Sequence, residues 1–418
     1  MKRVLRIAAI VLLALVLLLA GAWWWLTGTA SGASFLLGQV ESRVETLEYR
    51  DVEGGLSSGL SLAAVRFAQG DLEVTADGLE LAVDLDLFPL TVHVERLHLR
   101  EAVVNLPPGG EPEPAAEPFR PGDYSAPLPI DVGSLIVDGL TLVTAGEAEP
   151  TVVERIELAG RYAEALRIRA LSIEMAPYRL TASGRLGLSA PWPADLEAGL
   201  DWQLAPNQSQ RLDIALGGQL NALEIEVEGR GPLAAEAGAE LRGLPDPDAL
   251  NGQITASGRL QDWPELPGRF DEVRIEAEGS LEDWRAEVDG RVMWPDQPTV
   301  ELSLAAEGRE DSIRIERGVF DLLDGRIDVT GQAALGDPLT ANAAIRLEAL
   351  DFTPLYPDWP SQAAVSGGFD AGFDGRELTI EELALRAPLA ALEVHGGGRF
   401  DIENQALDVG LAWASLNW

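Results

Sequence analysis

The feature that most constrains the fold is an alternation of apolar and charged residues, which recurs from about residue 49 to the end of the 418-residue chain. Leu223, Ile225 and Val227, for example, are separated by single glutamates. Successive side chains on a β-strand point to opposite faces, so each such segment has one apolar face and one charged face. Residues 79–87 and 273–278 show the same pattern.

The alternating segments are short, and Gly, Asp, Asn and Pro separate them, as expected of turns. No long amphipathic helix interrupts the series, which argues against βαβ architectures. The pattern therefore predicts a mainly-β chain of about 25 to 30 strands.

Two internal repeats support this organisation. Residues 94–104 (VERLHLREAVV) align with residues 132–142 (VGSLIVDGLTL), and both fit V-x-x-L-x-(L/V)-x-x-(A/L)-x-(V/L). Residues 258–263 (GRLQDW) recur as residues 279–284 (GSLEDW). Repetition of this kind is typical of stacked units, here one strand and turn about every 10 to 15 residues.

An uncharged apolar segment at residues 7–26 precedes the strands. At about 1.5 Å per residue it would span about 30 Å, the thickness of a bilayer's hydrocarbon core. Basic residues lie before the segment and none follows it until Arg43, which predicts a cytoplasmic N-terminus and an exported body. The expected membrane-interface residues are Lys2, Arg3, Arg6, Trp23, Trp24 and Trp25.

A cleaved signal peptide is the alternative interpretation of this segment. Ala20-Gly21-Ala22 has the small-residue spacing of a cleavage site. The apolar run continues past this triplet into three tryptophans, which favours an uncut anchor. Both interpretations export the rest of the chain.

Composition excludes several classes of function. The formal net charge of −37 would repel nucleic acid phosphates and anionic lipid headgroups, so no nucleic-acid partner is expected. The absence of cysteine removes thiol catalysis and thiolate metal sites. Residues 107–127 include seven prolines and predict an extended loop between two strand regions.

These features divide the chain into six segments. They are a cytoplasmic N-terminus (1–6), a transmembrane anchor (7–26), a short helical connector (27–48), a first β segment (49–106), a proline-rich loop (107–127) and a repetitive β region (128–418).

Catalytic and metal-binding motifs are weak. Residues 55–59 match G-x-S-x-G, but that motif needs a following helix and a histidine partner, so we interpret it as a turn. His93 and His98 are five residues apart, which predicts opposite faces of a regular strand and no shared metal. His395 precedes three glycines and is predicted to lie at a strand end.

Two closely spaced acid pairs are predicted to be solvated rather than catalytic. Asp84 and Asp86 lie on the polar face of a predicted strand, and Asp246 and Asp248 lie in a predicted turn.

Several segments resemble the TamB family, the inner-membrane components of the translocation and assembly module within the wider AsmA-like group. Residues 52–62 (VEGGLSSGLSL) and a strand region ending in residues 103–108 (VVNLPP) resemble its N-terminal region. Residues 350–357 (LDFTPLYP) and 366–370 (SGGFD) are similar to its middle region. The resemblance covers most of the chain and rests on patterns of Gly, Leu and Val.

The resemblance implies an elongated, curled β-sheet (a β-taco) that crosses the periplasm from a single inner-membrane anchor. It implies a lipid conduit that supports phospholipid transport to the outer membrane and outer-membrane biogenesis, with inner-membrane phospholipids as partners. The alternative is a scaffold for outer-membrane protein (autotransporter) assembly with a TamA-like barrel partner. No enzymatic activity, cofactor or metal is expected. The family is usually longer, and residues 411–418 end the chain in what is predicted to be mid-strand, so we expect either a truncated chain or one that lacks the C-terminal, partner-facing domain.

The apolar strand residues by themselves fit either a closed core or an open groove. The resemblance favours a groove that takes the acyl chains of phospholipids. The expected groove residues are Leu79, Leu81, Val83, Leu85, Val92, Val94, Leu97, Leu99, Leu135, Val137, Leu223, Ile225, Val227, Val273 and Ile275.

Overall fold

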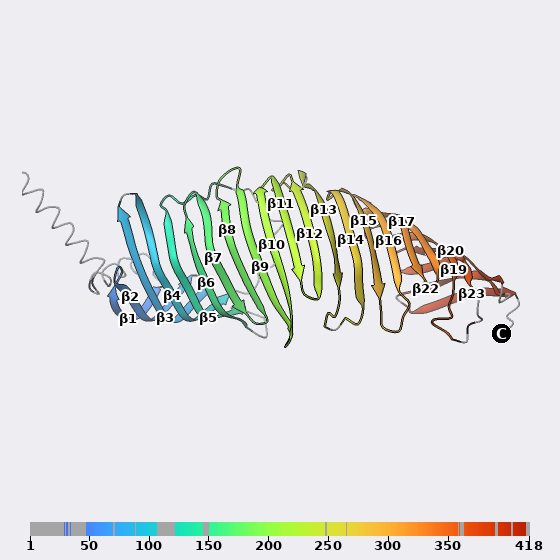
Figure 1. The fold of residues 1–418 in the computed structure, drawn as a ribbon, viewed down its shortest axis with the longest axis horizontal. Coiled ribbons are helices and arrows are strands. Elements are labelled where there is room, and N and C mark those ends of the chain that lie inside the picture. The colour runs from blue at the N-terminus through green and yellow to red at the C-terminus, as the bar shows by residue number, and fades with distance from the viewer. Residues whose placement is uncertain are drawn as a thin grey trace, which may run out of the picture. The chain divides into compact units, whose positions relative to one another are not determined.

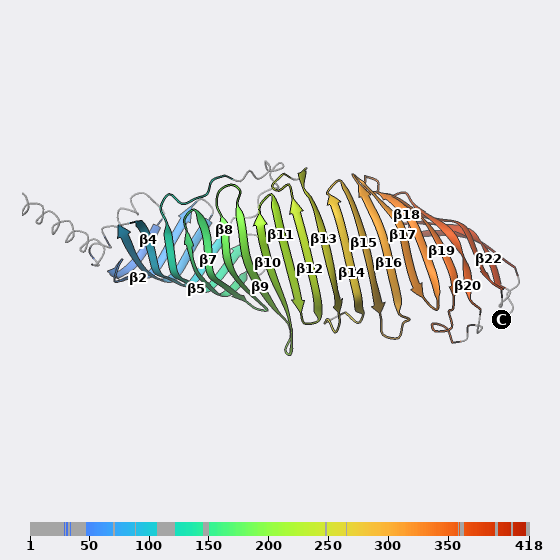
Figure 2. The ribbon, with the colours of Figure 1, turned by 45° about the horizontal axis from the view of Figure 1, so that its top comes forward.

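The structure is a computed structural model of the chain. It describes residues 47–69, 72–87, 89–106, 122–144 and 150–414, with short gaps at 247–248, 265, 358, 360–362, 389–391 and 403, and three single residues before residue 47. The chain divides into two compact units, Met1–Gln203 and Leu204–Trp418. Each unit consists of consecutive strands that lie side by side in chain order (Figures 1 and 2).

The strands of the first unit are β1 (Leu47–Gly55), β2 (Gly59–Gln69), β3 (Leu72–Leu87), β4 (Leu90–Leu106), β5 (Ile130–Thr144), β6 (Thr151–Tyr162), β7 (Ala165–Met175), β8 (Tyr178–Gly187) and β9 (Pro193–Ala205), which ends at the boundary. The strands of the second unit are β10 (Gln208–Gln219), β11 (Ala222–Arg230), β12 (Leu233–Arg242), β13 (Asn251–Leu260), β14 (Arg269–Ser280), β15 (Asp283–Met293), β16 (Val300–Arg309), β17 (Ser312–Leu322), β18 (Gly325–Ala334), β19 (Thr340–Leu350), β20 (Val365–Phe373), β21 (Glu377–Ala387), β22 (Leu392–Asp401) and β23 (Ala406–Ala414).

The mainly-β prediction is confirmed, with fewer and longer strands than expected. The described residues form 23 strands, and β3 and β4 contain 16 and 17 residues. Within each unit every strand pairs with the next one along the chain, and all of these pairs are antiparallel except β4–β5. The second unit is therefore an open meander, with its turns alternating between two opposite edges of the sheet, and the first unit follows the same pattern except at β4–β5.

The parallel pair β4–β5 explains the first sequence repeat. Val94 pairs with Val132 and Leu99 pairs with Val137, which is the same offset as in the alignment of residues 94–104 with 132–142. The two copies lie beside each other in register and present the same apolar residues to one face. A parallel pair needs a long return connection, which residues 107–129 provide.

The two copies of the second repeat, residues 258–263 and 279–284, do not lie beside each other in register. Asp262 and Trp263 follow the end of β13, whereas Asp283 and Trp284 begin β15. Because β14 lies between them and runs across the whole sheet, the two similar segments lie at opposite edges.

β-Bulges occur where successive apolar residues are three rather than two positions apart, so that both residues still lie on the apolar face. In β14, Asp271 and Glu272 separate the apolar residues Phe270 and Val273, and the pairing with β15 shifts register there. Glu272 takes a φ of 52°. A bulge absorbs the extra residue and bends its strand, so the apolar side chains on both sides of it keep to one face. The same three-residue spacing with a register shift occurs at Val94/Leu97, Val132/Leu135, Ile168/Leu171, Ile315/Gly318, Leu347/Leu350 and Ile380/Leu383.

The first six strands share a second irregularity, in which successive apolar residues again lie three positions apart. These positions pair with one another from strand to strand. Leu99 and Ala102 of β4 pair with Val137 and Leu140 of β5, and Glu101 between the first two has a φ of 48°. Because neighbouring strands share the irregularity, pairing continues without a shift and the sheet bends along a line. The equivalent pairs are Tyr49/Val52, Leu62/Val65, Ala76/Leu79 and Val153/Ile156.

The predicted N-terminal elements are not tested by this structure. The anchor at residues 7–26 lies outside the described residues, as does most of the connector at 27–48, whose last two residues belong to β1. Among the residues that the structure describes, no helix is long and apolar enough to cross a membrane. Of the proline-rich loop, only residues 122–127 are described; the Tyr124 amide donates to the Leu188 carbonyl at 2.8 Å.

Gly308 allows a tight contact in the second sheet. The indole of Trp284 on β15 lies over Gly308 of the paired strand β16, where an added Cβ would overlap the ring. We expect Gly308→Ala to lower the free energy of unfolding by about 1 to 3 kcal/mol, the usual effect of overpacking. Thermal or denaturant unfolding of the whole chain would measure this.

Two further variants make the test specific. In a Trp284→Ala background the effect of Gly308→Ala should largely disappear, because the overlapping ring is gone. Gly217→Ala is the matched control, since a Cβ there meets no atom within 4 Å. Equal destabilisation by Gly308→Ala with and without Trp284 would contradict this account.

Candidate functional site

One face of the second sheet carries unbroken rows of apolar residues. Directly paired residues point to the same face, so the register can be followed from strand to strand. The row through Ile225 crosses all fourteen strands without a polar side chain. It consists of Leu216, Ile225, Ala239, Ile254, Ala277, Ala286, Ala306, Ile315, Gly331, Ala343, Ala371, Ile380, Gly398 and Val409.

The first sheet has an equivalent row across its nine strands, made only of branched aliphatic side chains. It consists of Val52, Leu62, Leu79, Leu99, Val137, Ile156, Ile173, Leu180 and Leu200. We call the face that carries these rows the apolar face of each sheet.

All fifteen predicted groove residues lie on an apolar face. In the first sheet Leu79, Leu99 and Val137 share the row above, and Leu81, Leu97 and Leu135 form the next one. Val83 pairs with Val94, and Leu85 pairs with Val92. In the second sheet, Leu223, Ile225 and Val227 of β11 lie on three adjacent rows. Ile275 of β14 belongs to the same row as Val227. Val273 pairs with Gly258 on the next row.

The burial of these side chains is intermediate. Fourteen of the fifteen are half-buried, and Val137 is fully buried. In the second unit most of the fully buried apolar residues, such as Leu350 and Val365, lie near the loop between β19 and β20 rather than along the strands. No second layer of described residues covers this face, so Ile254 remains 44% exposed in mid-strand.

The first unit is more closed where its sheet bends. Leu60 and Leu62 are 2% and 3% exposed and form one cluster, against which Leu79 and Leu81 pack. Ala76, Ala102 and Val137 form a second cluster. Several predicted groove residues therefore also contribute to a small local core.

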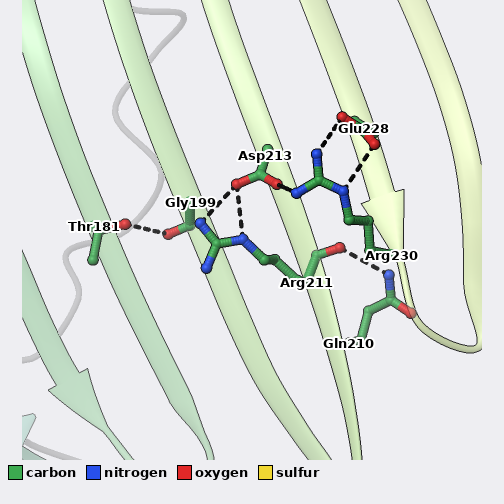
Figure 3. A network of polar contacts seen from close by, with 7 residues as sticks. All are labelled: Thr181, Gly199, Gln210, Arg211, Asp213, Glu228 and Arg230. Carbon is green, nitrogen blue, oxygen red and sulfur yellow. Dashed lines mark hydrogen bonds and ion pairs between the residues drawn. The ribbon is translucent and has the colours of Figure 1, made fainter.

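The opposite face of each sheet is charged. Arg230 donates to Glu228 at 2.8 and 2.6 Å and to Asp213 at 2.7 Å, and Asp213 also accepts from Arg211 at 2.9 Å. Figure 3 shows these side chains turned toward one another across β10 and β11. Exposed pairs of this kind contribute little stability, so their main effect is to keep this face hydrated.

A hollow of about 500 Å³ lies on the charged face near the ends of β12–β16. Its walls include Arg242, Arg285 and Arg309 together with Glu240 and Glu278. This lining is unsuited to hydrocarbon, which separates the hollow from the apolar face.

The predicted placement of His93 and His98 on opposite faces is wrong. The bulge at Glu95 shifts the pairing with β3, and both imidazoles lie on the charged face. They have different partners: His93 lies 3.0 Å from Asp86 and His98 lies 2.7 Å from Asp138. Among the described residues no group of three or more His, Cys, Asp or Glu could hold a metal ion.

The remaining motif residues are part of the sheet. Gly55 and Gly59 pair across a turn in which the Gly55 amide donates to Ser58 Oγ at 3.1 Å, so strand–turn–strand replaces the strand–turn–helix of a nucleophile elbow. The predicted strand end at His395 is wrong, because His395 and the glycines after it lie inside β22. Asp84 and Asp86 are exposed on the charged face.

The sequence interpretation missed the loops at the edges of the second sheet. Three loops at one edge carry a Trp-Pro dipeptide, at residues 263–264, 294–295 and 359–360. The dipeptide is visible in the sequence, but only the strand topology shows that Trp263, Trp294 and Trp359 share an edge.

Comparison with known proteins agrees with this architecture. The family model described as "TamB, N-terminal domain" matches residues 18–148 and 127–408. The chain belongs to the TamB family. A similar TamB protein, the "Translocation and assembly module subunit TamB" of Haemophilus influenzae (strain ATCC 51907 / DSM 11121 / KW20 / Rd), is 24% identical over 281 residues. The alignment covers 61% of this chain and 21% of that relative, and no solved structure matches the chain.

The carboxylates of the charged face should make the free energy of unfolding depend on pH in the acid range. The hydrogen bond from Arg211, together with the charges of Arg211 and Arg230, holds the pKa of Asp213 below its ordinary value of 3.8. The folded state then binds fewer protons than the unfolded chain, so this stabilisation is present above pH 3.8 and lost as the pH falls below it. We expect Asp213→Asn to lower the thermal midpoint more at pH 7 than at pH 3, and an equal effect at both pH values would contradict this assignment.

Proposed function

We propose that this chain is a membrane-anchored, non-enzymatic lipid conduit that supports phospholipid transport from the inner to the outer membrane. The observation that carries the proposal is the set of unbroken apolar rows on a face that no described layer covers. The proposed cargo is inner-membrane phospholipid. The proposed placement is a single-pass inner-membrane anchor with a cytoplasmic N-terminus and a periplasmic body.

The energetics of acyl chains favour such a surface. Each buried CH₂ contributes about 0.8 kcal/mol, so exposing a chain of about 16 carbons to water costs about 12 kcal/mol. Fourteen strands about 4.8 Å apart give a row of roughly 60 Å in the second sheet. This exceeds the roughly 15 Å depth of one bilayer leaflet. A tail can therefore move along the row while remaining in apolar contact.

The face opposite supports the same proposal. Glu224, Glu226 and Glu228 alternate with the apolar residues of β11 and are exposed. A charged outer face keeps the protein soluble and gives hydrocarbon only one face to occupy.

A role in outer-membrane protein assembly is the second candidate, because the related H. influenzae protein is a subunit of a translocation and assembly module. Such a role would use β-addition, in which an exposed strand edge accepts another strand. A TamA-like barrel would be the partner. Protein adducts formed from photoreactive residues along β23 would support this function, and phospholipid adducts on the apolar face would support the conduit.

Adjacent residues of β13 allow a matched test of the conduit. Ile254 lies on the apolar face and is 44% exposed, whereas Thr255 lies on the charged face and is exposed. We expect Ile254→Glu to reduce capture of a phospholipid with a photoreactive acyl chain severalfold, because the carboxylate must be desolvated beneath hydrocarbon.

Thr255→Glu adds the same charge on the other face and should leave capture unchanged. Both variants should unfold at temperatures close to that of the parent chain, since both positions are accessible. Undiminished capture by Ile254→Glu, or an equal loss in both variants, would contradict the proposed function.

A further inference from the structure

The two edges of the second sheet differ in the side chains that their loops present. Because the strands form a meander, the loops after β13, β15 and β19 lie at one edge, and those after β14, β18 and β22 lie at the other. The first set contains Trp263, Trp294, Phe352, Tyr356 and Trp359, and we call it the tryptophan rim. The second set contains no aromatic residue and presents Leu281, Leu335, Leu339 and Ile402, and we call it the aliphatic rim.

The tryptophan rim continues directly from the apolar face. Trp294 follows Val292 by two residues, and Val292 pairs with Phe270 and Val300 at the last position of the apolar face before the edge. Trp294 is 39% exposed and Tyr356 is 64% exposed, so both rings remain accessible from solvent. Tryptophan and tyrosine with one apolar and one hydrated side are typical of the headgroup level of a membrane.

Two of these rings are held in place by their surroundings. Trp294 reaches over the neighbouring loop, where an added Cβ on Gly268 would lie 2.8 Å from its Cε3 atom. Trp359 donates from Nε1 to the Ala363 carbonyl at 2.8 Å and packs on Phe352 with ring centroids 5.4 Å apart. Rings that are positioned before a ligand arrives lose little freedom when they bind it.

Each of the three Trp-Pro dipeptides at this edge has an aspartate next to it in the sequence. The three segments read Asp262-Trp263-Pro264, Trp294-Pro295-Asp296 and Asp358-Trp359-Pro360. Arg269 lies 3.9 Å from Asp262 and offsets part of its charge, whereas Asp296 is exposed two residues from an accessible indole. An aromatic face beside a carboxylate attracts an ammonium group and repels an anion.

We propose that the tryptophan rim binds the ammonium-bearing headgroups of zwitterionic phospholipids whose acyl chains lie on the apolar face. This inference rests on the proposed conduit and adds an orientation and a headgroup preference to it. Lipids lie across the sheet with their headgroups at the tryptophan rim. Anionic phospholipids lacking an ammonium group bind less well, because Asp296 and the overall charge of −37 repel them.

The test measures the headgroups of bound lipid. The full chain is incubated with vesicles of equal parts phosphatidylethanolamine and phosphatidylglycerol that share the same acyl chains, and the captured lipids are quantified. We expect the parent chain to enrich phosphatidylethanolamine about two- to fivefold, the range of an exposed cation–π contact. Trp294→Ala should bring the ratio close to that of the vesicles, and Trp294→Phe should retain most of the enrichment.

Two variants guard against indirect effects of removing a large ring. Asp296 has a φ of 58°, which asparagine also tolerates, so Asp296→Asn removes the charge without straining the loop. It should lower the enrichment as well. Leu335→Ala on the aliphatic rim, where Leu335 is 53% exposed, is the control and should leave the ratio unchanged.

The outcomes separate this inference from the proposed function. Capture of both lipids in the vesicle ratio by the parent chain would overturn the headgroup preference and leave the conduit intact. An enrichment that survives both Trp294→Ala and Asp296→Asn, or that Leu335→Ala removes equally, would overturn the assignment to the tryptophan rim. Capture of no lipid at all would overturn the conduit and the headgroup inference together.

Discussion

The hydrogen-bond register between consecutive strands is the constraint on which the rest of this structure depends. Side chains alternate between faces with a period of two, so a slip of one residue would move a whole strand's aliphatic residues to the charged face. The register instead places Ile225 beside Ala239 and Ala239 beside Ile254, and this continues from strand to strand. This register keeps the charged side chains of all strands on one face and the apolar side chains on the other.

Bulges reconcile that register with curvature. A bulged strand bends and twists, and each bulge here places two residues in place of one between successive positions of the apolar face. In β7 the bulge residue Arg169 reaches across β6 to Asp131 at 3.2 and 3.0 Å and to the Val132 carbonyl at 2.6 Å, where β5 is itself irregular. The sheets can therefore curve without exposing hydrocarbon on the charged side.

The consequence for function is a surface that is apolar but not closed. A core of this size would bury most of its aliphatic side chains completely, whereas only thirteen apolar residues are fully buried among those that the structure describes. Membership of the TamB family and an uncovered aliphatic face lead to the same proposal, a path for acyl chains. The loops at the two edges of the second sheet differ, because those of the tryptophan rim present aromatic residues and those of the aliphatic rim present none, and the proposed headgroup binding would orient a lipid across the strands.

The sequence alone determined the strand class and which residues share the apolar and the charged face, because a period of two is a local property that burial enforces on each strand. It could not determine the position of His98 relative to His93, because the bulge at Glu95 lies between them and shifts the alternation of faces in that strand. It showed the repeat of residues 94–104 and 132–142 but not their parallel pairing, which depends on the return path of the chain. Only the tertiary structure placed Trp263, Trp294 and Trp359 at one edge, since that depends on which strands are neighbours and in which direction each one runs.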